Sequence, residues 1–223
     1  MSDADRPSLS GPLVGAILLA AGGSTRLGRP KQLLMYRGRT LLRHAVEQAL
    51  ASRARPIVVV LGADEARCQE ELTGLAATDV VIASNPDWAV GMGSSIHTGV
   101  ATLIARAPEV QGALILLCDQ PLVTASVLDT LIARHAEAPG ATIAASYADE
   151  PGVPALFPRA RFDELTRLDG ASGAKRLLRA SGATGATGDT GLITVPCPDA
   201  AIDVDTLADY EALPHAAPQP ELR

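Results

Sequence analysis

Residues 15–34 read GAILLAAGGSTRLGRPKQLL, and the rest of the chain is interpreted outward from this stretch. It begins with an apolar run, residues 16–20, of the length expected for a buried parallel strand. A glycine-rich turn follows, and Arg26 and Lys31 come shortly after Gly22. Glycines let the backbone approach a ligand closely and direct several N–H groups at one anion, and nearby cations add to that attraction. The stretch therefore predicts a phosphate-binding loop at the end of a strand.

Two better-known phosphate motifs fit these glycines less well. The dinucleotide fingerprint G-x-G-x-x-G requires a spacing that Gly22, Gly23 and Gly28 do not have. The Walker A motif is matched over residues 23–28, but its Lys-Ser/Thr pair does not follow, and Pro30 interrupts the helix that should begin there. The simplest alternative is a glycine-rich turn whose cations are solvated.

Residues 19–34, LAAGGSTRLGRPKQLL, resemble the signature of nucleotidyltransferases that activate small phosphorylated molecules with a nucleoside triphosphate. More narrowly, the stretch is similar to the molybdenum cofactor cytidylyltransferase branch of the MobA-like NTP transferases. The resemblance implies an α/β fold, a Rossmann-like three-layer sandwich with a mostly parallel central sheet, of the nucleotide-diphospho-sugar transferase type. The nucleotide-binding residues that it implies in this stretch are Leu19, Ala20, Ala21, Gly22, Gly23, Ser24, Arg26 and Lys31.

Composition agrees with a layered α/β domain and excludes several other classes. The chain has 223 residues, of which 47% are apolar and only 3% aromatic, so its core must be aliphatic. A net charge of −6 without a long basic block argues against nucleic-acid binding. The 3 cysteines are far apart and odd in number, which favours neither a zinc site nor a disulfide framework.

The two ends of the chain are expected to be peripheral. The polar, acidic start differs from a signal peptide, and no apolar run approaches the ~18 residues of a membrane span. We therefore expect a soluble cytoplasmic protein without membrane contact. Residues 1–12 are interpreted as a disordered leader, residues 13–213 as a single nucleotidyltransferase domain and residues 214–223 as a tail.

Hydrophobic patterns predict alternating strands and helices along the domain. The expected strands are residues 14–20, 56–62, 79–83, 112–117, 141–147 and 192–195. The expected helices are residues 40–50, 64–72, 96–105, 124–136, 161–168 and 207–212.

A second polar loop, residues 85–99, reads NPDWAVGMGSSIHTG and precedes an apolar helical pattern. Serines at a helix N-terminus offer hydroxyls and free N–H groups to a polar ligand, or they simply cap the helix. The segment is similar to the NPxWxxGMxSSLxxG pattern of the same branch, which implies contact with the nucleobase and ribose. The implied residues are Asn85, Gly93, Ser94 and Ser95. We expect Trp88 to anchor this loop.

Acidic residues follow two extended segments. Asp119 follows the most apolar predicted strand, residues 112–117, which we expect to be central in the sheet. An acid at the carboxyl end of such a strand lies where α/β sheets bind ligands, and Mg²⁺ prefers carboxylate and phosphate oxygens. Asp203 and Asp205 are two residues apart on an extended segment and so face the same side. By resemblance, all three acids belong to one Mg²⁺ site. The alternative for Asp119 and Asp205 is that each caps the helix after it.

The acceptor side is assigned by resemblance alone. Residues 152–158, GVPALFP, are similar to the GxPxLF segment of the family, which implies that Gly152 and Pro154 face the acceptor. Relatives usually carry an acidic GDxGAR segment next, whereas this chain has GASGAK at residues 170–175. The missing carboxylate at Ala171 bears on acceptor recognition more than on nucleotide binding.

The activity implied is transfer of CMP from CTP to the phosphate of molybdopterin, the molybdenum cofactor, with Mg²⁺ and release of pyrophosphate. Arg26, Lys31 and Asp119 are the implied catalytic residues. A molybdoenzyme that receives the product is a candidate partner. The alternatives are a guanylyl- or other nucleotidyltransferase with a different phosphorylated acceptor, and a non-catalytic nucleotide- or cofactor-binding chaperone.

Overall fold

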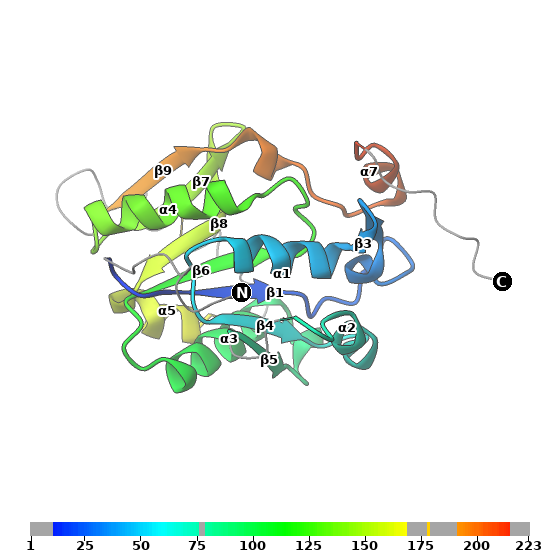
Figure 1. Cartoon of the computed structure of the whole chain (residues 1–223), viewed down its shortest axis with the longest axis horizontal. Coiled ribbons are helices and arrows are strands. Elements are labelled where there is room, and N and C mark those ends of the chain that lie inside the picture. The colour runs from blue at the N-terminus through cyan, green and yellow to red at the C-terminus, as the bar shows by residue number, and fades with distance from the viewer. Residues whose placement is uncertain (1–10, 76–78, 169–177, 179–190, 215–223) are drawn as a thin grey trace.

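The computed structural model describes residues 11–75, 79–168, 178 and 191–214. Apolar segments between turns pair into a seven-stranded sheet (Figure 1). Its strands are β1 (Val14–Leu19), β4 (Ile57–Leu61), β5 (Val80–Ser84), β6 (Gly112–Leu117), β7 (Thr142–Tyr147), β8 (Glu150–Pro158) and β9 (Leu192–Pro196). A separate two-stranded hairpin consists of β2 (Met35–Tyr36) and β3 (Arg39–Thr40).

The strand order in the large sheet is β5-β4-β1-β6-β8-β7-β9. β1, β4, β5 and β6 form parallel pairs, and β7 and β9 are also parallel to each other. β8 runs antiparallel to both of its neighbours, β6 and β7. The sheet is therefore mostly parallel, and β6 lies in its middle, as its apolar sequence predicts. The carboxyl ends of β1, β4, β5 and β6 meet at one edge, which brings the loops after them together.

Helices cover both faces of the sheet and produce the expected three layers (Figure 1). The α-helices are α1 (Leu41–Ala51), α2 (Glu65–Glu71), α3 (Met92–Arg106), α4 (Ala125–Glu137), α5 (Phe162–Thr166) and α7 (Leu207–Glu211). α1, α2 and α4 pack on one face, and α3 and α5 pack on the other. Strand residues alternate between the two cores, so Leu18 of β1 contributes to the first and Ile17 to the second.

Short 3₁₀ turns join several of these elements. They are η2 (Lys31–Leu33), η3 (Trp88–Val90), η4 (Arg159–Arg161) and η5 (Pro198–Ala201). A third, smaller apolar cluster joins the β2–β3 hairpin to α7 through Tyr36, Val204 and Tyr210. This cluster holds the segment before α7 beside the loop that follows β1.

The expected elements are present, with two differences in extent, but the strands β2, β3 and β8 were not predicted. α3 begins at Met92 and not near residue 96, so Ser94 and Ser95 lie in its first turn. The helix expected at residues 161–168 is the 3₁₀ turn η4 followed by the short helix α5. Residues 1–10, 170–175 and 215–223 lie outside the described residues, so the division into leader, single domain and tail stays a prediction.

Candidate functional site

One buried glutamine, Gln32, fixes the conformation of the loop after β1. Gln32 is 1% exposed, and its Nε2 donates hydrogen bonds to the carbonyls of Ala20 at 2.8 Å and Gly22 at 2.7 Å. These carbonyls therefore point into the protein. Among the described residues, the N–H groups of Gly22 and Gly23 have no acceptor. The loop thus presents free donors at the edge of the sheet, as a phosphate-binding loop requires.

Ser24 joins the first half of the same loop to the second half, which contains Lys31 and Gln32. Its backbone has φ of 50°, a left-handed conformation uncommon for a residue with a side chain. Its Oγ accepts a hydrogen bond from the backbone N–H of Lys31 at 3.0 Å and lies 3.4 Å from Oε1 of Gln32. Residues 20–32 are therefore bonded to one another, and Lys31 is placed at the start of η2.

Four of the predicted site residues come together in one cluster of charges. The ammonium of Lys31 forms an ion pair with Oδ2 of Asp119 and lies 3.0 Å from Oδ1 of Asp205. The guanidinium of Arg26 lies 3.0 Å from Oδ2 of Asp205. Lys31 and Asp119 are mostly buried, with 18% and 11% of their side chains exposed, whereas Arg26 is 75% exposed. The Lys31–Asp119 pair is thus the fixed part of the cluster.

The charges in this cluster shift one another's pKa values. Burial lowers the pKa of Lys31, but the charge and hydrogen bond of Asp119 outweigh it and raise the pKa above its usual range. The hydrogen bond from Lys31 lowers the pKa of Asp205. Asp203 is exposed, yet desolvation of its carboxyl and the charges of Asp119 and Asp205 raise its pKa. Both shifts favour the charged forms, so Lys31 is protonated and Asp205 is ionised at neutral pH.

Neither aspartate acts as the helix cap considered above. The residue at the N-cap of α4 is Thr124, and α7 is capped by Thr206. Within the described ranges, Oδ1 of Asp119 is buried and has no hydrogen-bond partner. A buried carboxylate oxygen without a partner is costly, so it marks a place where a cation or a donor is expected.

The carboxylates of this cluster suit a divalent metal in their chemistry. The part of the chain that is described holds no ready-made group of three or more His, Cys, Asp or Glu side chains arranged around a metal position. Instead, Lys31 lies between Asp119 and Asp205. Mg²⁺ takes only one or two protein carboxylates when phosphate oxygens complete its shell, and the unpartnered oxygen of Asp119 has the chemistry of such a ligand. The residues present fit the metal.

The loop before α3 bonds its polar side chains to one another, and the predicted contact with a nucleotide stays a prediction. Asn85 is buried, and its Nδ2 donates to Oγ of Ser94 at 3.0 Å and to Oγ of Ser95 at 2.9 Å. Its Oδ1 accepts from the backbone N–H of Asp87 at 3.1 Å. The Asn85 amide is therefore occupied by the protein itself and shapes the loop. The first turn of α3, with Gly93, still faces the same edge of the sheet.

Trp88 connects this loop to the phosphate-binding loop. A Cβ added to Gly62 would lie 2.6 Å from Cβ of Trp88, and one added to Gly23 would lie 2.9 Å from its ring. Both glycines therefore make room for the indole. The backbone N–H of Ala63 also bonds to the carbonyl of Ala21 at 3.0 Å. Trp88 anchors its loop, as expected, and does so against the glycines of the first loop.

Gly152 and Pro154, the predicted acceptor residues, are both buried at the start of β8. A Cβ on Gly152 would overlap the hydroxyl of Tyr147, so the tyrosine ring covers this glycine. Tyr147 is partly exposed, and its hydroxyl lies 3.3 Å from the carbonyl of Val153. A ligand on this side would meet Tyr147 before Gly152. The GASGAK segment lies outside the described residues.

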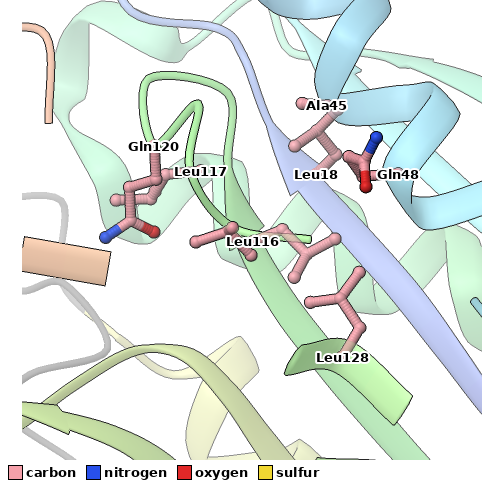
Figure 2. Close-up of a pocket in the computed structure, with 8 residues that line it drawn as sticks. Leu18, Ala45, Gln48, Leu116, Leu117, Gln120 and Leu128 are labelled. Carbon is pink, nitrogen blue, oxygen red and sulfur yellow. The ribbon is translucent and has the colours of Figure 1, made fainter. Parts of the chain in front are cut away.

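Two hollows lie near the cluster, and neither contains it. A cavity of about 10 Å³, space for one water molecule, lies behind the Asp119 turn among aliphatic side chains, with Gln48 and Gln120 at its border (Figure 2). A larger cleft of about 200 Å³ lies on the flank between the Asn85 loop, α3 and α5. The charged cluster itself lies at the sheet edge between its loops.

Three residues that bond to backbone carbonyls around the site could not be found by motif matching. Gln32, Gln120 and Tyr147 carry no charge and fit no spacing rule. The available signal was a polar residue directly before an apolar pair, as at Gln32 in the segment KQLL, or directly after an acid, as at Gln120.

The fold and the site define a class: an α/β nucleotidyltransferase domain of the Rossmann-like nucleotide-diphospho-sugar transferase type. The chain belongs to the MobA-like NTP transferase domain family, whose model matches residues 16–185. Membership in this family supports an enzyme that transfers nucleotidyl groups. In the described part of the chain, no helix has the length and apolarity that crossing a bilayer demands.

The names of the relatives describe different activities. The chain is 39% identical to nicotine blue oxidoreductase of Paenarthrobacter nicotinovorans over 157 residues, 69% of this chain and 70% of that protein. It is 28% identical to the purine catabolism protein PucB of Bacillus subtilis, over 76% and 82% of the two chains. The crystal structure of Rv0371c from Mycobacterium tuberculosis superposes with a TM-score of 0.71 at 30% identity, covering 90% of this chain and 96% of that one. Rv0371c has also been solved in complex with manganese.

Proposed function

We propose that this protein transfers CMP from CTP to the terminal phosphate of molybdopterin and releases pyrophosphate, with Mg²⁺ as its metal. The observation that carries the proposal is the ion-paired cluster in which Lys31 contacts both Asp119 and Asp205 beside a loop with free N–H groups. This arrangement supplies cations for phosphates and carboxylates for a metal within one site.

The reaction needs positioning and charge stabilisation and no covalent step from the protein. An oxygen of the acceptor phosphate attacks the α-phosphorus of CTP, and the bond from that phosphorus to the oxygen bridging it to the β-phosphate breaks. Pyrophosphate leaves with the bonding electrons. The N–H groups of Gly22 and Gly23 bind the triphosphate, and Lys31 and Arg26 stabilise charge on the reacting and leaving groups.

Asp119 and Asp205 would hold the metal, with Asp203 beside them. When bound, Mg²⁺ supplies positive charge to the phosphate oxygens and helps orient them. The ammonium of Lys31 must then leave at least one of its two carboxylates to contact a phosphate. Arg26, which is largely exposed, can leave Asp205 at little cost, because exposed ion pairs contribute little stability.

The choice of cytosine as the nucleobase and of molybdopterin as the acceptor is supported mainly by the family resemblance. The first turn of α3, with Gly93, Ser94 and Ser95, faces the proposed nucleotide, and Asn85 fixes the positions of the two serine hydroxyls. Tyr147 and the start of β8 would border the acceptor. A molybdoenzyme that receives the product is part of the same proposal.

The test is pyrophosphate release by the purified protein with Mg²⁺ and molybdenum cofactor, comparing CTP with GTP and ATP. Release with CTP alone supports the proposal. Release with GTP keeps the mechanism and assigns the protein to guanylyl transfer. No release with any nucleotide, in protein that binds CTP tightly, would contradict the transferase assignment for this acceptor.

A second candidate is a redox reaction on a small heteroaromatic molecule, because a relative 39% identical to this chain is an oxidoreductase. The N–H groups of Gly22 and Gly23, which have no acceptor among the described residues, would then bind the pyrophosphate of a reduced nicotinamide dinucleotide without the G-x-G-x-x-G spacing. The dinucleotide would donate a hydride to the substrate, and a proton from water would complete the two-electron reduction. Oxidation of that dinucleotide in the presence of nicotine blue, without pyrophosphate release, would favour this candidate.

A further inference from the structure

Gln120 lies directly after Asp119 and is buried, with 6% of its surface exposed. Its Nε2 donates hydrogen bonds to the carbonyl of Val153 at 3.1 Å and to the carbonyl of Ala200 at 2.7 Å. The amide nitrogen has two hydrogens, and both are used. Figure 2 shows that the carboxamide points away from Leu18 and Gln48 on the other side of the small cavity.

The two carbonyls belong to separate parts of the site. Val153 lies in β8 between Gly152 and Pro154, the proposed acceptor residues. Ala200 lies in η5, three residues before Asp203. One side chain therefore joins the turn that carries Asp119 to the acceptor strand and to the segment that carries the other two aspartates.

Nearby bonds make these links stiffer. The backbone N–H of Val204 donates to the carbonyl of Asp119 at 3.0 Å, which fixes the distance between the two carboxylate segments. Tyr147, whose ring covers Gly152, bonds to the same Val153 carbonyl as Gln120. A shift of Tyr147 on acceptor binding would thus be transmitted to Asp119 and to the Asp203–Asp205 segment through Gln120.

We propose that Gln120 is a positioning residue that couples the acceptor strand to the carboxylate segment, so that both move as one unit. The coupling rests on the proposed function for its role in catalysis. Its structural content, the joint ordering of residues 152–154 and 202–205, stands on the hydrogen bonds alone.

The variants are Gln120→Glu, which removes both donors, and Gln120→Met, which keeps the volume without a buried charge. Gln111→Glu is the matched control, because Gln111 is exposed and its side-chain amide, within the described ranges, bonds only to the nearby Glu109 carbonyl. Hydrogen–deuterium exchange of the full chain should rise in both residues 152–156 and residues 202–205, while residues 20–24 keep their exchange rate. The control should change none of these segments.

In pyrophosphate-release assays, Gln120→Met should raise KM for the acceptor and lower kcat. We expect a loss of about 10- to 100-fold in kcat/KM for the acceptor, the scale of a small misplacement of reacting groups, with KM for CTP nearly unchanged. A variant with lower thermal stability but unchanged exchange in the two segments and an unchanged acceptor KM would overturn the coupling. If wild-type protein releases no pyrophosphate but the exchange still rises in both segments, the proposed function fails and the coupling stands.

Discussion

The loop after β1 and the segment with Asp203 and Asp205 contribute to the same cluster of charges, but they are held in different ways. The loop is bonded to itself: Gln32 and Ser24 contact atoms within a span of 12 residues. The carboxylate segment depends on partners far away in sequence, since Asp205 bonds to Lys31, 174 residues before it.

The difference indicates how the site can work. A self-bonded loop keeps its N–H groups in place before any ligand arrives, so a phosphate meets preorganised donors. A segment held by a few long-range bonds can adjust when the metal and acceptor bind. We therefore expect changes in the loop to affect nucleotide binding first, and changes around the aspartates to affect metal and acceptor binding first.

The largest expected effect is at the ion pair that joins the two regions. Lys31→Ala and Asp119→Ala should each lower kcat for pyrophosphate release at least ~100-fold, the scale of losing one preorganised charge-stabilising group. Arg134→Ala is the control, because Arg134 pairs with Glu137 on the exposed surface of α4 and should leave turnover unchanged.

The same pair of variants separates the two proposed reactions. Transfer requires both residues, whereas a dinucleotide-dependent reduction has no need of a metal carboxylate. Asp119→Ala protein that is inactive in transfer supports the proposal. Near-normal pyrophosphate release by both variants would contradict it.

The next effect should be confined to the loop. Gln32→Glu replaces the donor facing the carbonyls of Ala20 and Gly22 with a buried carboxylate. Leaving such groups unpaired costs roughly 1–3 kcal/mol each. We expect a lower Tm and a KM for CTP raised about 10-fold, the factor that corresponds to the lower part of that range.

Isothermal titration with CTP and with Mn²⁺ alone would check where this effect lies. Affinity for CTP should fall and affinity for Mn²⁺ should hold, and Gln111→Glu should alter neither. An equal loss for both ligands would show that the loop and the carboxylates are not separate regions.

The two regions also differ in how far the sequence predicts them. The strand, the glycine turn and the cations of residues 15–34 are close together in the chain, so local patterns were enough to indicate a phosphate-binding loop. Position after a strand, together with the family resemblance, selected Asp119, because parallel strands end at a common edge. The central place of β6 followed from its apolar sequence, whereas the order of the other strands and the antiparallel strand β8 were not predicted.

Contacts that depend on tertiary packing could not be predicted from the sequence. Lys31 was assigned to phosphate and Asp119 to metal, and nothing in their spacing indicated that they pair with each other. Asn85 was assigned to the nucleotide, and nothing in the sequence indicated that its buried amide bonds to Ser94 and Ser95. Gln32 and Gln120 gain their roles only because the fold buries them beside backbone carbonyls.

A smaller effect concerns the stability of the sheet away from both regions, and it depends on pH through His135. His135 of α4 is buried against Gly112 and Leu156, at the opposite end of β6 from Asp119, and within the described ranges its ring nitrogens have no partners. Burial lowers its pKa from the ordinary 6.5. As pH falls through 6.5, His135 therefore binds a proton in the unfolded chain before it does so in the folded one. The free energy of unfolding thus decreases below pH 6.5 and is retained above pH 6.5.

Urea unfolding at about pH 7.5 and about pH 5.5 measures this loss. Wild type should lose about 1 kcal/mol more than His135→Leu between the two pH values, since each pH unit below the unfolded pKa costs at most about 1.4 kcal/mol per group. His97→Gln, at an exposed histidine, is the control. Parallel pH profiles for wild type and His135→Leu would contradict the assignment.

The smallest effect tests what holds the carboxylate segment. Thr206 caps α7: its Oγ accepts from the N–H of Asp209 at 3.2 Å, and the Asp209 carboxylate accepts from the N–H groups of Thr206 and Asp205. Thr206→Ala should cost about 1 kcal/mol, as loss of a helix N-cap does. Thr206→Ser keeps the hydroxyl and is the matched control.

This cap adjoins Asp205. If the hydrogen bonds of Val204 and Gln120 hold the segment with Asp203 and Asp205 in place, the cap is not needed for that. Val204 is fully buried, and its N–H bonds to the Asp119 carbonyl whether or not the cap is present. Thr206→Ala should therefore weaken Mn²⁺ binding only about 2- to 5-fold, within the free energy of the lost cap, and leave KM for CTP unchanged. If Thr206→Ala lowered turnover as much as Lys31→Ala, the cap of α7 would be what positions Asp205. The positioning role proposed for Gln120 would then belong to α7.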